Sequence, residues 1–243
     1  MIVTFTDFGL EGPYLGQVKA VFHRLAPGVP VVDLVADAPV CDPFAASYLL
    51  AALVEEFPPA VFFCVVDPGV GGERRAIVAE IDGRLFVAPD NGLLEPALRR
   101  GGNVRSWDIV WRPERLSATF HGRDLFAPIA GRLAGGQAPE ACGCRPATVP
   151  HRPDWPDDLA AIVYIDHYGN AVTGLRADRI APDAHILVGD RRLKAGRTFS
   201  DSPPGIPFWY ANSSNLVELA VNGGRADRVL SVGIGSVFTV VGG

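Results

Sequence analysis

The sequence predicts two domains: an α/β domain with a mostly parallel sheet, followed by a C-terminal antiparallel, β-barrel-like domain. Three observations favour this fold class. The first half alternates strand and helix patterns, the middle is rich in glycine and proline, and the last part contains short strands separated by turns. We therefore expect an α/β domain at 1–138, a linker at 139–158 and a C-terminal β domain at 159–243.

The N-terminal half begins as a β-α-β-α-β series. Its expected elements are a strand at 2–6, a helix at 14–25, a strand at 31–35, a helix at 43–56 and a strand at 61–66. The last of these strands reads as buried, because it is a continuous apolar run that ends at Asp67. Such a series predicts a largely parallel sheet covered by helices, with ligands bound beyond the carboxyl ends of its strands.

Later elements are shorter. Residues 76–81 and 85–88 flank Asp82-Gly83, which predicts a β-hairpin, and a helix is expected at 125–133. Beyond the linker we expect antiparallel strands at 161–165, 184–188, 216–221 and 237–241.

The amino-acid composition is that of an ordinary globular protein, and it excludes several classes of protein. Hydrophobic residues make up 48% and charged residues 20%, and no apolar run reaches the roughly 18 residues that would span a bilayer. A net charge of −5 without a lysine-rich block argues against nucleic-acid binding. The sequence shows no export signal at its start, so a cytoplasmic location is expected.

The four cysteines do not suggest a disulfide framework. Cys41 and Cys64 read as small core residues. Cys142-Gly-Cys144 with His151 could seed a metal site, but the paired ligand groups of a zinc ribbon or finger are missing. We therefore expect no metal.

The turn after the first strand carries Asp7 and Phe8. A carboxylate there can accept two hydrogen bonds from a ribose diol, although it could equally cap the next helix. The nicotinamide-type G-x-G-x-x-G pattern is absent, because Gly72 is followed by Glu73-Arg74.

A second candidate group consists of Asp67, Arg74 and His121. The glycine-rich segment between Asp67 and Arg74 can loop back so that the guanidinium meets the carboxylate and keeps it ionised. The alternative is a structural ion pair that closes a loop. His121 lies between Phe120 and Gly122, a context unlike that of a core histidine, whereas we assign Asp124 a structural role at the start of a helix.

Two polar turns stand out in the second half. Asp166, Tyr168 and Asn170 offer a carboxylate, an aromatic face and an amide that can match an adenine edge, unless the turn is only a hairpin. Asn212-Ser213-Ser214-Asn215 has the same ambiguity. Glu218, on an otherwise apolar strand, requires an inward partner or a solvent face, and a ligand ammonium could be that partner.

Taken in order, six motifs resemble the S-adenosylmethionine hydroxide adenosyltransferase family, which includes the fluorinase and the chlorinase. The resemblance covers nearly the whole chain. The motifs are Thr-Asp7-Phe-Gly, Asp67-Pro-Gly-Val-Gly, Pro89-Asp-Asn-Gly92, Phe-His121-Gly-Arg-Asp, Asp166-His-Tyr-Gly-Asn170 and Asn212-Ser-Ser-Asn215.

The resemblance implies roles for individual residues. It places Asp7 on the ribose hydroxyls, with Phe8 beside it, and Asp67, Arg74 and His121 at the catalytic triad of the water-using members. Asp166 and Ser213 would hold the methionine end, Asn170 would read adenine and Phe199 would pack on its face; Tyr168 and Glu218 complete the expected substrate-binding set. It also implies a homotrimer in which each site is shared between the N-terminal domain of one subunit and the C-terminal domain of the next.

Two diagnostic places separate this chain from the halogenases. At the positions of Asp67-Pro-Gly-Val70 the fluorinase carries a sequence similar to Tyr-Pro-Ala-Thr, and at the positions of His121-Gly122 it carries Tyr-Ser. A carboxylate beside an entering halide would repel it. Ser214 and Val221 stand where the fluorinase carries arginines, so the methionine carboxylate is expected to depend on other groups.

The expected function is hydrolysis of S-adenosylmethionine (SAM) to adenosine and L-methionine, with no cofactor and with this small molecule as the partner. A chlorinase-type halogenase, or a non-catalytic SAM or adenosine sensor, is the alternative.

Overall fold

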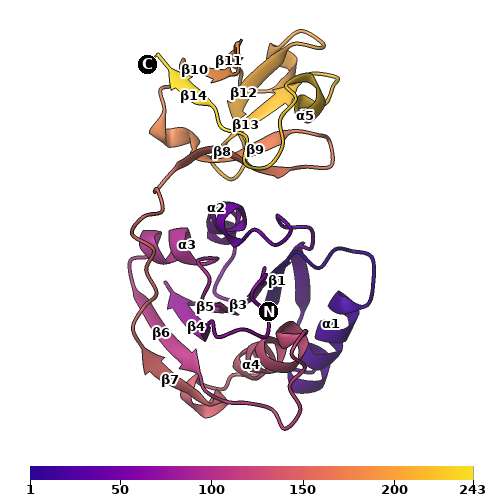
Figure 1. Cartoon of the computed structure of the whole chain (residues 1–243), viewed down its shortest axis with the longest axis vertical. Helices are drawn as coiled ribbons and strands as arrows, with labels where there is room; N and C mark the ends of the chain where they lie inside the picture. Colours follow the sequence, from indigo (N-terminus) through magenta and orange to yellow (C-terminus); the bar gives the residue numbers. More distant parts are fainter. Residues whose placement is uncertain (243) are drawn as a thin grey trace. The chain divides into compact units, whose positions relative to one another are not determined.

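The computed structural model describes residues 1–242 and divides into two compact units. The first unit comprises Met1–Leu50 and Phe57–Pro153, and the second comprises Asp154–Gly243 together with the short segment Ala51–Glu56. Each unit has its own seven-stranded sheet (Figure 1).

The sheet of the first unit is mixed, with strand order β2-β1-β3-β5-β4-β6-β7. Its β2-β1-β3-β5 half is parallel, whereas β4, β6 and β7 run antiparallel to their neighbours. The strands are β1 Ile2–Thr6, β2 Val31–Val35, β3 Val61–Val65, β4 Ala76–Ile81, β5 Arg84–Pro89, β6 Val104–Ile109 and β7 Cys144–Ala147. The expectation of a mostly parallel sheet is therefore wrong for this second half.

The reversal begins at the predicted hairpin. Strands β4 and β5 pair from Ala76↔Pro89 to Ile81↔Arg84, so only Asp82 and Gly83 connect them. Both have positive φ angles, 49° and 82°, as the favoured two-residue hairpin turn requires. Because β4 then also pairs with β6, the hairpin inserts an antiparallel strand into the sheet.

Helices cover both faces of this sheet (Figure 1), with α1 and α4 on one side and α2 and α3 on the other. Alternate residues of β3 face opposite layers: Phe63 contacts Phe22 of α1, with ring centroids 5.4 Å apart, whereas Phe62 stacks on Phe86 at 4.7 Å. The helices are α1 Tyr14–Leu25, α2 Pro43–Leu53, α3 Glu95–Arg100 and α4 Ala127–Ala134.

Two expected helices differ at their ends. The helix expected at 43–56 closes as a 3-10 turn at Val54–Glu56. A π-helical turn at Gly122–Phe126 precedes α4.

The segment expected to be a linker is partly structured. A 3-10 turn at Glu140–Cys142 leads into β7, which pairs with β6 and forms the edge of the first sheet. Cys142 and Cys144 are buried in the core of this unit. The burial of these two small side chains holds this piece of chain against the sheet, which turn-residue content alone did not indicate.

The second unit is built on a curled, half-barrel sheet with strand order β14-β10-β11-β12-β13-β9-β8. Its neighbouring strands are antiparallel except β11 and β12, which are parallel. The strands are β8 Leu159–Ile165, β9 Ala171–Arg176, β10 His185–Val188, β11 Arg191–Ala195, β12 Pro207–Ala211, β13 Leu216–Val221 and β14 Thr239–Val241. The sequence pattern did not indicate β9, β11 or β12.

No helix within residues 1–242 is both long enough and apolar enough to cross a bilayer.

Candidate functional site

A carboxylate, a guanidinium and an imidazole meet beyond the carboxyl end of β3. Arg74 Nε donates to Asp67 Oδ1 at 2.8 Å, and Arg74 Nη2 donates to Asp67 Oδ2. The same Nη2 lies 3.2 Å from His121 Nδ1. The side chains of Asp67 and Arg74 are only 4% and 12% exposed, so this pair is a shielded, bidentate interaction. The sequence-predicted trio is thus assembled.

Backbone turns hold this cluster together. The N–H of Val70 donates to the carbonyl of Asp67 at 3.2 Å, and that of Gly72 donates to the carbonyl of Gly69 at 3.0 Å. Gly71 has φ +80° and lies so close to the loop before His121 that an added Cβ would be 2.4 Å from the carbonyl oxygen of Ala118. The loop that carries Arg74 therefore packs directly on the loop that leads to His121.

His121 is buried, with 8% of its surface exposed. Burial lowers the pKa of its imidazole, and the neighbouring Arg74 guanidinium lowers this pKa further. The ring is therefore neutral near pH 7. Since Arg74 can only donate, Nδ1 must accept, and the single ring proton lies on Nε2.

Asp7 lies directly after β1 and is half-buried. Its Oδ2 accepts the N–H of Cys41 at 2.9 Å. Burial raises the pKa of this carboxyl above its usual value, although the Cys41 hydrogen bond opposes the shift. The helix-cap alternative does not hold, because α1 begins at Tyr14 with Pro13 at its N-cap and no side-chain cap.

Phe8 belongs to an aromatic cluster. Its ring centroid lies 5.8 Å from that of Phe120 and 6.1 Å from that of Tyr14. An added Cβ on Gly122 would be 2.9 Å from Cζ of Phe8 and 3.2 Å from a ring atom of Phe120. Glycine at this position thus allows the His121 turn to approach the aromatic cluster.

Asp124 has a structural role, but not as the cap of α4. Its carboxylate accepts the N–H of Ser117 at 2.9 Å and two hydrogen bonds from Arg123. These contacts lower the pKa of Asp124, chiefly through the Arg123 hydrogen bond. It fixes the loop that precedes His121.

The second unit carries a cavity of about 890 Å³. Every substrate-binding residue expected in this half lines it, namely Asp166, Tyr168, Asn170, Phe199, Ser213 and Glu218. The sequence analysis did not single out Tyr210, Gly223 or Gly224, which also line the cavity. The two polar turns are also hairpin turns, since they connect β8 to β9 and β12 to β13.

Asp166 fixes the orientation of Asn170. Its Oδ1 accepts the backbone N–H of Asn170 at 2.8 Å, and its Oδ2 accepts from Asn170 Nδ2 at 2.9 Å. Asn170 is 4% exposed, and its Oδ1 has no hydrogen-bond partner among the described residues. A buried acceptor without a partner is costly, and it is the kind of atom that a ligand donor satisfies.

Glu218 joins two walls of the same cavity. One carboxylate oxygen accepts from the hydroxyl of Tyr210, and the other accepts from Asn212 Nδ2 at 2.9 Å. Burial raises the pKa of Glu218, while these two hydrogen bonds oppose the shift. Asn212 Oδ1 in turn accepts the N–H groups of Ser214 and Leu216, both at 3.0 Å, so Glu218 fixes the turn that presents Ser213.

The sequence could have indicated Tyr210 only with knowledge of the strand pairing. Tyr210 lies directly opposite Glu218 in the β12–β13 ladder, and its ring contacts Phe199 with centroids 5.6 Å apart. A buried glutamate on an apolar strand requires a donor across the sheet, which is the available signal.

The candidate metal ligands pack or pair with other parts of the protein. His151 Nδ1 lies 2.9 Å from Glu95 Oε1, and Cys142 and Cys144 are buried. Within residues 1–242 no group of three His, Cys, Asp or Glu side chains is placed to hold a metal ion.

Comparisons with known proteins identify the family of this chain. Residues 2–143 match the SAM hydroxide adenosyltransferase N-terminal domain and residues 160–239 the C-terminal domain. The chain is 38% identical to an (R)-S-adenosyl-L-methionine hydrolase of Salinispora arenicola, over 98% of this chain and 96% of that protein. It is 37% identical to a Thermus thermophilus protein of the same name, over 93% and 94% of the two chains.

More distant relatives and solved structures extend the comparison. A fluorinase of Actinopolyspora mzabensis is 25% identical over 91% of this chain and 90% of that protein. An uncharacterized conserved protein from Thermotoga maritima has a crystal structure with a TM-score of 0.86, 32% identity and 99% coverage of both chains.

The fold and cavities define a two-domain protein in which a mixed α/β sheet and a half-barrel β sheet each present a group of polar side chains. The chain belongs to the SAM hydroxide adenosyltransferase family.

Gly71→Ala is expected to disrupt the Asp67 cluster. The new methyl group would collide with the Ala118 carbonyl, whereas Gly28 has nearly the same φ, +81°, with no atom within 4 Å of an added Cβ. Gly28→Ala therefore isolates the backbone cost of about 1–2 kcal/mol. In urea unfolding, Gly71→Ala should lose clearly more stability than this control; equal losses would mean that the two loops adjust freely.

The lowered pKa of His121 predicts a pH effect on stability. An unfolded histidine titrates near 6.5 and the folded one below it, so protonation favours the unfolded state. The His121 contribution is fully present above pH 6.5 and declines as the pH falls toward the folded pKa. The free energy of unfolding should fall more steeply in this window for the natural protein than for His121→Gln. Parallel pH profiles would contradict the prediction.

Proposed function

We propose that the protein hydrolyses SAM to adenosine and L-methionine. The observation that carries this proposal is the shielded Asp67–Arg74–His121 cluster in a chain that is 38% identical, over nearly its full length, to a protein named as a hydrolase of this substrate. No cofactor is required in the proposed reaction, because the sulfonium is already an activated leaving group.

The proposed step is in-line attack of water on the ribose 5′ carbon. The C–O bond forms as the C–S bond breaks, and the electron pair of that bond neutralises the sulfonium. The leaving thioether needs no proton, so catalysis consists of holding one water in line and accepting its proton.

The hydrogen bonds of the cluster suggest which group accepts this proton. His121 uses Nδ1 to accept from Arg74, so its Nε2 carries a proton and can donate but not accept. Asp67 retains unused lone pairs on both oxygens, each of which accepts one hydrogen bond from Arg74. We therefore assign Asp67 as the proton acceptor and His121 Nε2 as a donor that orients the water.

Substrate binding is proposed to divide between the two units. In the first, Asp7 would accept from the ribose hydroxyls, and Phe8 would support the aromatic wall beside it. The second-unit cavity would hold the remainder, with Asn170 on adenine, Phe199 and Tyr168 as aromatic faces, and Asp166, Ser213 and Glu218 at the methionine end. The acidic side chains suit a substrate that carries sulfonium and ammonium charges.

A halogenase and a non-catalytic sensor are the alternatives. Asp67 places a negative charge where a halide would enter, which disfavours the first. A sensor would not require an ion-paired carboxylate beside a neutral imidazole. Incubation of the protein with SAM in ¹⁸O-labelled water, with and without chloride, distinguishes all three by mass spectrometry: labelled adenosine supports hydrolysis, 5′-chloroadenosine a halogenase, and unchanged SAM a sensor.

Asp67→Asn is expected to lower turnover by at least about 100-fold, the usual lower bound for loss of a general base. The substitution removes charge but almost no volume, so substrate binding should change much less. Product formation and binding calorimetry on the same preparation would measure both. Asp183→Asn, an exposed substitution with the same change of charge, should leave both unchanged. Undiminished turnover in Asp67→Asn would remove Asp67 from the mechanism.

The unpaired Oδ1 of Asn170 predicts base specificity. Adenine offers an N–H donor at its 6 position, whereas hypoxanthine presents an acceptor that would face this oxygen. Adenosine should therefore bind at least about 10-fold more tightly than inosine, a difference of about 1.4 kcal/mol. In Asn170→Ala the two nucleosides should bind alike. Equal affinities in the natural protein would argue that Asn170 does not read the base.

A cytoplasmic homotrimer with sites shared between subunits also remains a proposal. If Asp67 and Asn170 of one site come from different chains, mixing the inactive variants Asp67→Ala and Asn170→Ala should restore part of the activity after subunit exchange. Some sites would then combine two unmutated halves. If native mass spectrometry shows exchange and no activity returns, each site is assembled within one chain.

A further inference from the structure

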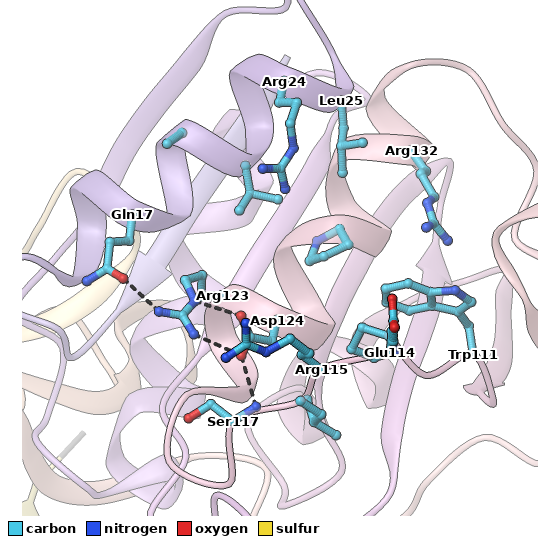
Figure 2. Close-up of a pocket in the computed structure, with 15 residues that line it drawn as sticks. Gln17, Arg24, Leu25, Trp111, Glu114, Arg115, Ser117, Arg123, Asp124 and Arg132 are labelled. Carbon is cyan, nitrogen blue, oxygen red and sulfur yellow. Dashed lines mark hydrogen bonds and ion pairs between the residues drawn. The ribbon is translucent and has the colours of Figure 1, made fainter.

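A second large cavity lies in the first unit. It has a volume of about 1000 Å³ and lies between α1 and the segment 111–132 (Figure 2). Asp7, Asp67, Arg74 and His121 do not line it. The proposed hydrolysis leaves this cavity without a role.

The base of the cavity is preformed and apolar. Val21, Leu25, Pro128 and the indole of Trp111 line it. Helices α1 and α4 approach so closely that a Cβ on Gly131 would be 2.9 Å from Cβ of Leu25. The surface beneath a ligand is therefore fixed by helix packing.

The rim is also tied in place. Asp124 accepts the N–H of Ser117 and is paired with Arg123, which also donates to Gln17 of α1 at 2.8 Å (Figure 2). This chain of contacts links the loop 113–117, the π-helical turn and α1. The elements that carry the cavity wall are thus connected to one another.

Charge is distributed unevenly over this wall. Four arginines, at positions 24, 115, 123 and 132, face two acids, Glu114 and Asp124. Asp124 neutralises Arg123, whereas the side chains of Arg24 and Arg115 make no ion pair or hydrogen bond with any residue in 1–242. Arg132 stacks on Trp111, 4.2 Å from the ring centroid, which leaves its N–H edges available. In a chain with net charge −5, this is a local concentration of unneutralised guanidinium groups.

We propose that this cavity binds a small organic polyanion, a molecule whose phosphate or carboxylate groups engage Arg24, Arg115 and Arg132 while its body covers the apolar base. Guanidinium forks match both anionic groups in geometry, and a volume of this size suits a metabolite or nucleotide-sized ligand. The unpaired Glu114 would repel a ligand whose negative charge extended over the whole rim. None of the residues proposed to carry out the hydrolysis lines this site.

Calorimetry of the full chain with pyrophosphate and with citrate, at constant ionic strength, tests the proposal. At least one probe should saturate one site per chain; tighter binding of pyrophosphate would identify a phosphate ligand, and tighter binding of citrate a polycarboxylate. Arg24→Gln and Arg115→Gln should each weaken binding at least about 10-fold, the usual effect of losing a charged hydrogen bond. Both side chains are exposed, so the fold should be unaffected.

Two further variants make the test specific. Arg191→Gln changes the net charge equally at an exposed position of the second unit and should leave binding within about twofold. Ala20→Glu places a carboxylate on the exposed cavity wall of α1 and should abolish binding. The proposal is overturned if neither probe saturates, if Arg191→Gln weakens binding as much as Arg24→Gln, or if Ala20→Glu has no effect.

Discussion

The ion pair between Asp67 and Arg74 is the interaction on which the candidate active site depends. A carboxylate that is 4% exposed would be costly to leave ionised without a partner, and the bidentate guanidinium supplies one. Arg74 also packs over the Phe126 ring, 5.3 Å from its centroid, and reaches His121 with the same nitrogen that binds Asp67. One side chain thus binds the acid, sets the tautomer of the imidazole and fixes the spacing between their loops.

The second unit uses carboxylates in a related way. Asp166 accepts one hydrogen bond from the backbone N–H of Asn170 and one from its side-chain amide, and Glu218 orients Asn212 and Tyr210 with one each. In both cases a carboxylate, which can only accept hydrogen bonds, determines the orientation of a neutral donor. The cavity is therefore preorganised before a ligand enters, which reduces the ordering cost of binding.

Local patterns predicted the elements that depend on local chemistry. Strands β1, β2 and β4 and helix α1 have the predicted bounds, because apolar spacing and turn residues define them. Asp7 and Asp67 follow their strands as expected, and Asp67 meets Arg74 because a short glycine-rich loop leaves few other arrangements. Contacts between distant segments were harder to predict. Strand β7 and the Tyr210–Glu218 pair depend on which strands become neighbours, and polar strands such as β11, Arg191–Ala195, carry almost no hydrophobic signal.

The two large cavities that lie within single units carry opposite charge, and this difference has a chemical consequence. The second-unit cavity is lined by Asp166 and Glu218 and by no lysine or arginine, which suits a substrate that is cationic at its sulfonium and ammonium groups. The cavity beside α1 instead collects arginines whose charge is only partly neutralised. A cationic substrate is attracted to the first and repelled by the second, whereas an anion behaves in the opposite way. Segregation of charge thus allows one small chain of net charge −5 to present two surfaces that do not compete for the same ligands.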